Sequence, residues 1–290
     1  MQVLVTGGQG FIGRYVIATL QAQGHTPVSF DRARTIAPAC AHVLGDVRDS
    51  VAVAESVARV EGVIHLAAVL GTQETVAAPE IAIATNISGS VTVFQACARF
   101  HVPCVYITVG NHWMQNPYSI TKTCAERFAW MANQEWGARI AVVRALNAYG
   151  PGQRAAPVRK IVPAFMEAAR TGRAIEIYGD GLQIMDMIHV RDVADILVRA
   201  LLVPHGQYQT PFEAGTGRRT TVREIAMMVA RAGGSAHLPV YLPMRPGEPW
   251  SSVVLGDPET LRPLYDGRLP RQTTLEEGLA ELIDPAGSGG

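Results

Sequence analysis

The amino-acid sequence predicts an α/β fold in which a doubly wound parallel sheet is followed by a smaller C-terminal lobe. Short apolar runs rich in β-branched residues alternate with helical stretches from residue 2 to residue 150, as expected for parallel strands joined by helices. Beyond Pro151 prolines and glycines become frequent and the elements become shorter. The sequence therefore predicts a main domain over residues 1–150 and a lobe over residues 151–283, with segments near 182–203 returning to the main sheet.

The first 31 residues follow the order strand, glycine-rich turn, helix, strand and acid. Residues 2–6 are an apolar run, Gly7-Gly8-Gln9-Gly10-Phe11-Ile12-Gly13 follows at once, and residues 14–23 have the apolar spacing of a helix. Residues 26–30 form a second apolar run that ends on Asp31. This order is typical of the Rossmann-type unit that binds a dinucleotide.

Each position in this unit has a physical reason. Gly7 lets the chain turn tightly off the strand, Gly10 removes a side chain where a pyrophosphate approaches the backbone, and Gly13 lets the helix lie close to the sheet. The helix N-terminus presents unpaired N–H groups to the phosphates. Asp31 can accept hydrogen bonds from both adenosine ribose hydroxyls, which favours NAD because a 2′-phosphate would meet a like charge. The neighbouring Arg32 lessens that preference.

Further strands are expected at residues 42–45, 62–68, 104–108 and 140–146, and helices at residues 51–60, 79–100 and 118–136. An acid at the end of the third strand, Asp46, can contact the adenine amino group, and Asp49 is placed to cap the next helix. His65 is expected to be a satisfied interior histidine, and Asn86 to occupy an exposed helix position. In the lobe, helices are expected at residues 161–171, 192–203, 221–232 and 274–282, and a strand at 174–178. The residues expected to contact the cofactor are Gly7, Gly10, Phe11, Ile12, Gly13, Asp31, Arg32, Asp46, Val47, Leu66, Ala67, Ala68, Tyr118 and Lys122.

Composition excludes several other classes of protein. The chain has 290 residues, and its 25 Lys plus Arg balance 25 Asp plus Glu, which gives no electrostatic case for nucleic acid or an anionic membrane as partner. No segment resembles a signal peptide, and no apolar run is expected to span a bilayer. The four cysteines form no CxxC pair, so neither a zinc or other metal site nor a disulfide framework is predicted. The reducing cytoplasm is the location that this cysteine usage favours. Residues 284–290 are expected to be a disordered tail.

Tyr118 and Lys122 are the first candidates for chemistry. They are four residues apart on a predicted helix and therefore lie on one face, a turn apart. A free tyrosine ionises at a pH of about 10. A neighbouring ammonium, together with the positive charge of a bound nicotinamide, favours the phenolate, which can then act as a general base near neutral pH. Thr108 ends the fifth strand, where ligands bind in such sheets, and its hydroxyl can share the hydrogen bond to the reacting oxygen.

Nine short stretches resemble the extended short-chain dehydrogenase/reductases, within the group of NAD-dependent nucleotide-sugar epimerases and dehydratases. They follow the order of the family along nearly the whole chain. The matching stretches are residues 6–13, 45–49, 65–68 and 86–89, Pro117-Tyr118-Ser119-Ile120-Thr121-Lys122 with Glu126, residues 144–152, 175–181 and 189–194, and Arg245-Pro246-Gly247-Glu248.

The resemblance implies an enzyme with tightly bound NAD that oxidises a nucleotide sugar transiently. It assigns Thr108, Tyr118 and Lys122 as the catalytic set. It implies that Asn147 and Arg245 bind the diphosphate, and that residues 175–178, with Ile177 and Tyr178, line the base. It also implies a homodimer formed through the helices at 79–100 and 122–136.

Departures from the family pattern favour one reaction over the others. The 4,6-dehydratases have an Asp-Glu pair after the threonine, and here Val109 and Gly110 cannot transfer protons. The sequence therefore favours a 4-epimerase acting on a UDP-sugar. A 4,6- or 5,6-dehydratase or an NAD(P)-dependent ketoreductase using His112 or Cys124 is the alternative, and a cofactor-sensing module without catalysis ranks last. Met185 stands where the family has an arginine for the phosphate.

Overall fold

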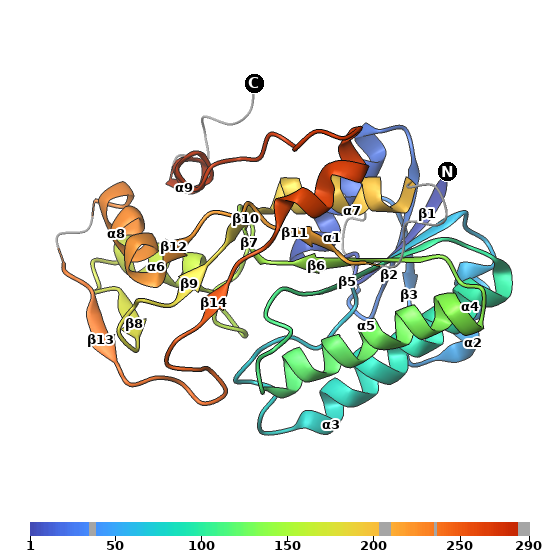
Figure 1. The fold of residues 1–290 in the computed structure, drawn as a ribbon, viewed down its shortest axis with the longest axis horizontal. Coiled ribbons are helices and arrows are strands. Elements are labelled where there is room, and N and C mark those ends of the chain that lie inside the picture. The colour runs from blue at the N-terminus through green and yellow to red at the C-terminus, as the bar shows by residue number, and fades with distance from the viewer. Residues whose placement is uncertain (35–38, 203–209, 235–236, 284–290) are drawn as a thin grey trace.

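A seven-stranded, wholly parallel sheet is the centre of the computed structural model, which describes residues 1–34, 39–202, 210–234 and 237–283 (Figure 1). The predicted tail at 284–290 lies outside the described residues. From one edge to the other, the strands are β11 (Phe212–Ala214), β6 (Ile140–Ala145), β5 (Cys104–Val109), β4 (Gly62–His65), β1 (Gln2–Thr6), β2 (Thr26–Asp31) and β3 (Ala41–Leu44). The strand order reverses between β1 and β4. Ligands of open α/β sheets bind at the carboxyl ends of the strands beside such a switch point.

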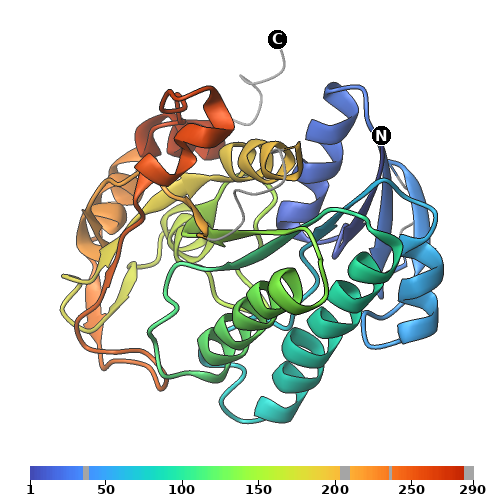
Figure 2. The same ribbon diagram turned by 45° about the vertical axis from the view of Figure 1, so that its right-hand side comes forward.

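Helices cover both faces of the sheet, as the doubly wound prediction requires. The helices α1 (Phe11–Ala22) and α7 (Val190–Leu202) lie on one face, and α2 (Ser50–Val57), α4 (Ser90–Phe100) and α5 (Pro117–Glu135) on the other (Figures 1 and 2). Side chains alternate along each strand. Val3 and Val5 accordingly belong to the core under α1 and α7, whereas Leu4 belongs to the core under α2 and α4.

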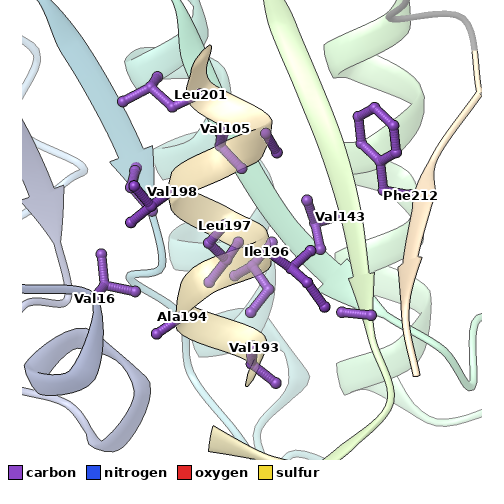
Figure 3. Packing of buried hydrophobic residues seen from close by; sticks show 14 of the residues in the cluster. Val16, Val105, Val143, Val193, Ala194, Ile196, Leu197, Val198, Leu201 and Phe212 are labelled. Atoms are coloured by element: carbon purple, nitrogen blue, oxygen red, sulfur yellow. The ribbon is translucent and has the colours of Figure 1, made fainter. Parts of the chain in front are cut away.

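The helix α7 explains how the second half of the chain returns to the sheet. Its apolar residues Val193, Ile196, Leu197 and Leu201 are buried and pack on β5 and β6, beside α1 (Figure 3). Burying one such side chain stabilises a fold by roughly 1.5–3 kcal/mol, so the apolar face of α7 holds it against the sheet although it lies between segments of the lobe in sequence.

The lobe has a core of its own. It contains α6 (Ile161–Arg170), α8 (Val222–Ala232) and α9 (Leu275–Ile283), and its buried residues include Phe165, Ile177 and Val229. Its short strands pair as β7 (Asn147–Tyr149) with β10 (Met187–His189), as β8 (Glu176–Tyr178) with β13 (Val240–Leu242), and as β9 (Ile184–Met185) between β12 (Thr220–Thr221) and β14 (Val253–Val254). The 3₁₀ helix η2 (Pro258–Tyr265) packs against β11.

The predicted helix at 79–100 consists of α3 (Pro79–Ala82), the π-helical η1 (Ile83–Gly89) and α4. The expectation that Asn86 is exposed is wrong. Its side chain is fully buried, accepts from the Val69 N–H at 2.7 Å, and donates to the Val69 carbonyl and the Thr121 hydroxyl, each at 3.0 Å. Asn86 therefore ties the loop after β4 to α5.

The same stretch corrects the expectation about membranes. Among the described residues, Pro79–Phe100 is long and apolar enough to cross a bilayer by length and composition, contrary to the sequence-based expectation. Half of its most apolar window is buried inside the protein, and α4 packs against α2 and α5. Its apolar character is therefore used in the protein core.

Two element boundaries differ from the prediction for identifiable reasons. Helix α1 begins at Phe11, three residues early, because Gly10 already has the extended conformation of an N-cap. Strand β4 ends at His65 rather than continuing through 68. There the Thr6 hydroxyl accepts hydrogen bonds from the N–H groups of Leu66 and Ala67, at 3.1 and 3.2 Å, which turns the chain away from the sheet. His65 is buried and bonded to Thr6 and Ser90, as expected.

Candidate active site

One large cavity of about 900 Å³ begins at the carboxyl ends of the central strands and continues into the lobe. Its volume is within the range of small-molecule and cofactor sites. We call it the main cavity. All fourteen residues expected to contact the cofactor line it, and so do Thr108, Asn147, Tyr178 and Arg245. The fold therefore brings together residues that lie more than two hundred positions apart in sequence.

The glycine-rich turn has the geometry that a dinucleotide requires. Gly7 has φ +71°, and a Cβ there would lie 2.9 Å from the Ala67 nitrogen. A Cβ on Gly13 would lie 2.3 Å from the Gly7 oxygen. The N-cap of α1, Gly10, has no side chain to satisfy the first N–H groups of the helix, and Gly10, Phe11 and Ile12 face the main cavity. Free donors at a helix N-terminus fit a diphosphate.

Two carboxylates line the part of the cavity where the adenosine is expected. Asp31 ends β2, and its carboxylate accepts from the backbone N–H of Gln9 at 3.0 Å and of Ala33 at 2.9 Å. Asp46 pairs with Arg48, with Nη2 to Oδ2 at 2.7 Å, and this hydrogen bond lowers the pKa of Asp46. Asp49 caps α2 by accepting from two backbone N–H groups, as the sequence predicted.

The start of α5 places the candidate catalytic groups. Asn116 caps the helix by accepting from the Ser119 N–H at 2.9 Å, so Tyr118 lies in the first turn and Lys122 one turn later. Thr108, near the end of β5, donates its hydroxyl hydrogen to the Lys122 carbonyl at 3.3 Å. The Lys122 ammonium lies 4.2 Å from the centre of the Tyr106 ring. Threonine, tyrosine and lysine thus meet on one wall of the cavity.

Burial dominates the electrostatics of this wall. Burial raises the pKa of Tyr118 to about 12. It lowers the pKa of Lys122 to about 7, against the opposing effect of Glu126. The expectation that a neighbouring ammonium lowers the tyrosine pKa is therefore not met in the protein alone, because the loss of water outweighs it. A positive charge bound in the cavity is needed to favour the phenolate.

Three residues considered for the site in the sequence lie away from the cavity. Ile177 is fully buried in the lobe core, whereas its neighbours Glu176 and Tyr178 line the cavity, since side chains alternate along β8. His112 lies in the loop between β5 and α5, where its carbonyl accepts from the Thr123 hydroxyl at 3.3 Å. Neither His112 nor Cys124 lines the cavity.

Several charged residues of the cavity were missed in the sequence. Glu74, Lys160 and Glu248 line its lobe side. Glu248 belongs to the Arg245-Pro246-Gly247-Glu248 stretch, so the sequence motif could have identified it. It receives Arg245 Nη2 at 2.6 Å and the Thr72 hydroxyl at 3.0 Å. Glu74 and Lys160 belong to no motif, so only the folded arrangement finds them.

Comparison with known proteins agrees with this geometry. The model of the NAD dependent epimerase/dehydratase family matches residues 3–212. The chain belongs to the NAD-dependent epimerase/dehydratase family. Within it, the chain is 29% identical to a UDP-glucose 4-epimerase of Mycolicibacterium smegmatis, over 98% of both proteins. It is 28% identical to a dTDP-glucose 4,6-dehydratase of the same organism, over 98% of this chain and 92% of that protein.

A solved structure extends the similarity to three dimensions. The UDP-glucose 4-epimerase of Thermotoga maritima with UDP-glucose superposes with a TM-score of 0.88 at 27% identity, and 98% of each chain is covered. The predicted Rossmann-type fold and the resemblance to the extended short-chain dehydrogenase/reductases are confirmed. Family membership makes the protein an enzyme, either an epimerase or a dehydratase, with NAD as its cofactor.

Over the ranges that the structure describes, no three or more His, Cys, Asp or Glu side chains are grouped to hold an ion.

Proposed function

We propose that the protein is a nucleotide-sugar 4-epimerase that oxidises C4 transiently, with a UDP-sugar as substrate. One observation carries the proposal. Thr108, Tyr118 and Lys122 face the main cavity, and the two residues after Thr108 that also line it are Val109 and Gly110. Loss of water from a sugar requires groups that donate and accept protons, and neither side chain can do so.

The chain's own residues divide the work along the cavity. Tyr118 takes the proton of the sugar hydroxyl, Thr108 holds the same oxygen, and Lys122 stabilises the phenolate. NAD, when bound, supplies the hydride acceptor and later the hydride donor. Asn147, Tyr178 and Arg245 stand on the lobe side, where they hold the nucleotide while the sugar turns to present its other face.

The nucleotide-sugar assignment is supported by the lobe side of the cavity. The Arg245 guanidinium lies 4.9 Å from the centre of the Tyr178 ring, so a cation and an aromatic surface adjoin each other. A diphosphate and a base need these two kinds of group. The Thermotoga maritima enzyme, crystallised with UDP-glucose, has the same fold over 98% of its chain.

Dehydration is the second candidate, because carboxylates are present elsewhere in the cavity. Glu74 and Glu248 line its wall, and the identity to a dTDP-glucose 4,6-dehydratase is nearly equal to that with an epimerase. Glu248 is engaged by Arg245 and Thr72, and Glu176, which also lines the cavity, by Arg159. Glu74 is therefore the candidate carboxylate for proton transfer in this alternative.

The decisive experiment is product analysis with a panel of UDP-, dTDP- and GDP-glucose and their galactose forms. We expect inversion at C4 for a UDP-sugar, without net NADH formation. Exchange of the C5 hydrogen with a keto or ene product would instead establish dehydration, and no turnover across the panel would reject both candidates.

A matched pair of variants tests the role of the phenol. Tyr118→Phe should lower kcat by about 10²- to 10⁴-fold, the usual contribution of general acid–base catalysis, while NAD stays bound. Tyr241→Phe is the control, because Tyr241 is about half exposed on β13. Unchanged turnover in Tyr118→Phe contradicts the proposed mechanism.

A further inference from the structure

Tyr106 is a buried aromatic residue that the proposed reaction has not used. It lies on β5 two residues before Thr108, and its side chain is fully buried. Its ring faces the Lys122 ammonium, with 4.2 Å between Nζ and the ring centre. Lys122 lines the main cavity and Tyr106 does not, so the ring lies behind the lysine, away from the cavity.

Two hydroxyls of β5 hold the backbone of the same lysine. Tyr106 donates its hydroxyl hydrogen to the Lys122 carbonyl at 3.2 Å, and Thr108 donates to the same oxygen at 3.3 Å. Residues two apart on a strand point to the same face, which is here the face on which α5 packs. Tyr106 therefore contacts Lys122 at both ends, at the backbone through its hydroxyl and at the ammonium through its ring.

The ring face is the group that compensates the buried ammonium. In the part of the chain that the structure describes, no hydrogen bond or ion pair reaches Lys122 Nζ. The Glu126 carboxylate, one turn later on α5, is engaged by Arg144 at 2.6 and 3.2 Å. An ammonium taken out of water is unfavourable without a compensating partner, and the electron-rich face of a phenol ring is such a partner.

Neighbouring side chains keep the Tyr106 ring in place. His65 stacks on it with ring centres 5.6 Å apart, and Phe94 meets it edge-on at 5.3 Å. The His65 imidazole is itself bonded to Thr6 at 2.6 Å and to Ser90 at 2.9 Å. Burial lowers the pKa of His65 to about 3, so this ring is neutral at physiological pH and brings no positive charge toward the ammonium.

We propose that Tyr106 is a positioning residue for Lys122: its ring holds the ammonium and limits the loss of its charge, and its hydroxyl fixes the helix turn that carries the lysine. The inference rests on the proposed function for its consequence, because the charge matters if Lys122 stabilises the Tyr118 phenolate. The other titratable groups that interact with Lys122 are His65 and Glu126, and Tyr118 lies one turn before it.

Titration of Lys122 by NMR, in the NAD-loaded full chain labelled with ¹³C-lysine, tests the inference. The chain has two lysines, Lys122 and Lys160, so Lys122→Met assigns the Lys122 Cε signal. Tyr106→Leu removes the electron-rich face and should raise the acid dissociation constant of the ammonium by about 3- to 30-fold. Tyr106→Phe keeps the face and should restore the wild-type titration. An unchanged titration in Tyr106→Leu overturns the inference.

Phe94→Leu is the matched control for lost packing. Phe94 is a buried ring of the same core, edge-on to Tyr106, and its removal leaves the ring face toward Lys122 in place. This variant should titrate as the wild type does. A shift as large as that of Tyr106→Leu would assign the effect to packing and contradict the inference.

A measurement on the wild type covers the case in which Tyr106→Leu does not fold. Protons above the face of an aromatic ring are shielded, so the Lys122 Hε signals should lie upfield of their position in the unfolded chain. Signals at the unfolded position would show that the ammonium end does not lie on the ring, and the inference would fail.

Turnover separates this inference from the proposed function. In Tyr106→Leu, kcat for C4 inversion at neutral pH should fall by about the same 3- to 30-fold, with KM unchanged. If the wild type inverts no sugar while Lys122 titrates as expected, the proposed function fails alone. If the wild type inverts C4 while Tyr106→Leu leaves the titration unchanged, the inference fails alone.

Discussion

At the scale of single residues, burial limits the ionisation of the Tyr118–Lys122 pair. With a pKa raised to about 12 the phenol is neutral at neutral pH, and with a pKa lowered to about 7 the lysine has lost much of its positive charge there. Burial removes water from around the phenol. The positive charge that favours the phenolate therefore has to come from the bound cofactor. We therefore expect binding of NAD and activation of Tyr118 to be coupled.

The effect of burial on Lys122 can be measured directly, because the chain contains only two lysines, Lys122 and Lys160. In protein labelled with ¹³C-lysine, the Lys122 Cε signal, assigned with Lys122→Met, should titrate with a pKa of about 7 in the absence of NAD. Between that value and the ordinary 10.5, the unfolded chain binds more protons than the folded chain, so this group makes stability rise with pH in that window. A midpoint near 10.5 contradicts the argument.

At the scale of elements, the turn at Gly7–Gly13 is a packing device as much as a binding site. A Cβ at position 13 would lie 2.3 Å from the Gly7 oxygen and 2.8 Å from the Gly8 Cα, and both are backbone atoms that cannot rotate away. Gly13→Ala should therefore destabilise the protein by about 1–3 kcal/mol, as overpacking usually does, and weaken NAD binding by moving α1.

Thermal unfolding with and without NAD measures both effects. Ala18→Ser is the control, since Ala18 is exposed on the same helix. If Gly13→Ala unfolds at the wild-type temperature and binds NAD equally well, the close approach of α1 to the turn does not matter.

The same elements explain what sequence patterns could predict. The alternating buried strands and the glycine turn are local signals, and they predicted the Rossmann-type fold and residues that line the main cavity. Ile177 was expected to line the nucleotide site, but successive side chains along β8 point in opposite directions. Ile177 therefore faces the lobe core, while its neighbours face the cavity. Strand β11 was missed because three residues carry no pattern of their own and become a strand only by pairing with β6. Lys160 and Glu74 enter the cavity from loops, where no periodicity exists.

At the scale of the whole molecule, the lobe is fastened to the sheet domain across the cavity. The Thr72 hydroxyl donates to Glu248 at 3.0 Å, and the Asn116 side chain donates to the Gly247 carbonyl at 3.4 Å. Asn116 also caps α5 in front of Tyr118. The stretch that holds Arg245 is therefore tied to the helix that holds Tyr118, so we expect nucleotide binding in the lobe to steady the proposed reacting end.

The outer face of the sheet domain indicates self-association. Ile81, Ile83 and Ile120 are about half exposed on α3, η1 and α5, three elements that pack against one another. Adjacent exposed apolar side chains mark contact surfaces, and we expect a homodimer through this face.

Light scattering after size exclusion should give twice the chain mass, and Ile81→Arg with Ile120→Arg should give a monomer, because charges would be buried without partners. Leu238→Arg is the control, since Leu238 is exposed on the lobe and its substitution should leave the mass unchanged. A wild-type monomer at every concentration tested contradicts the prediction.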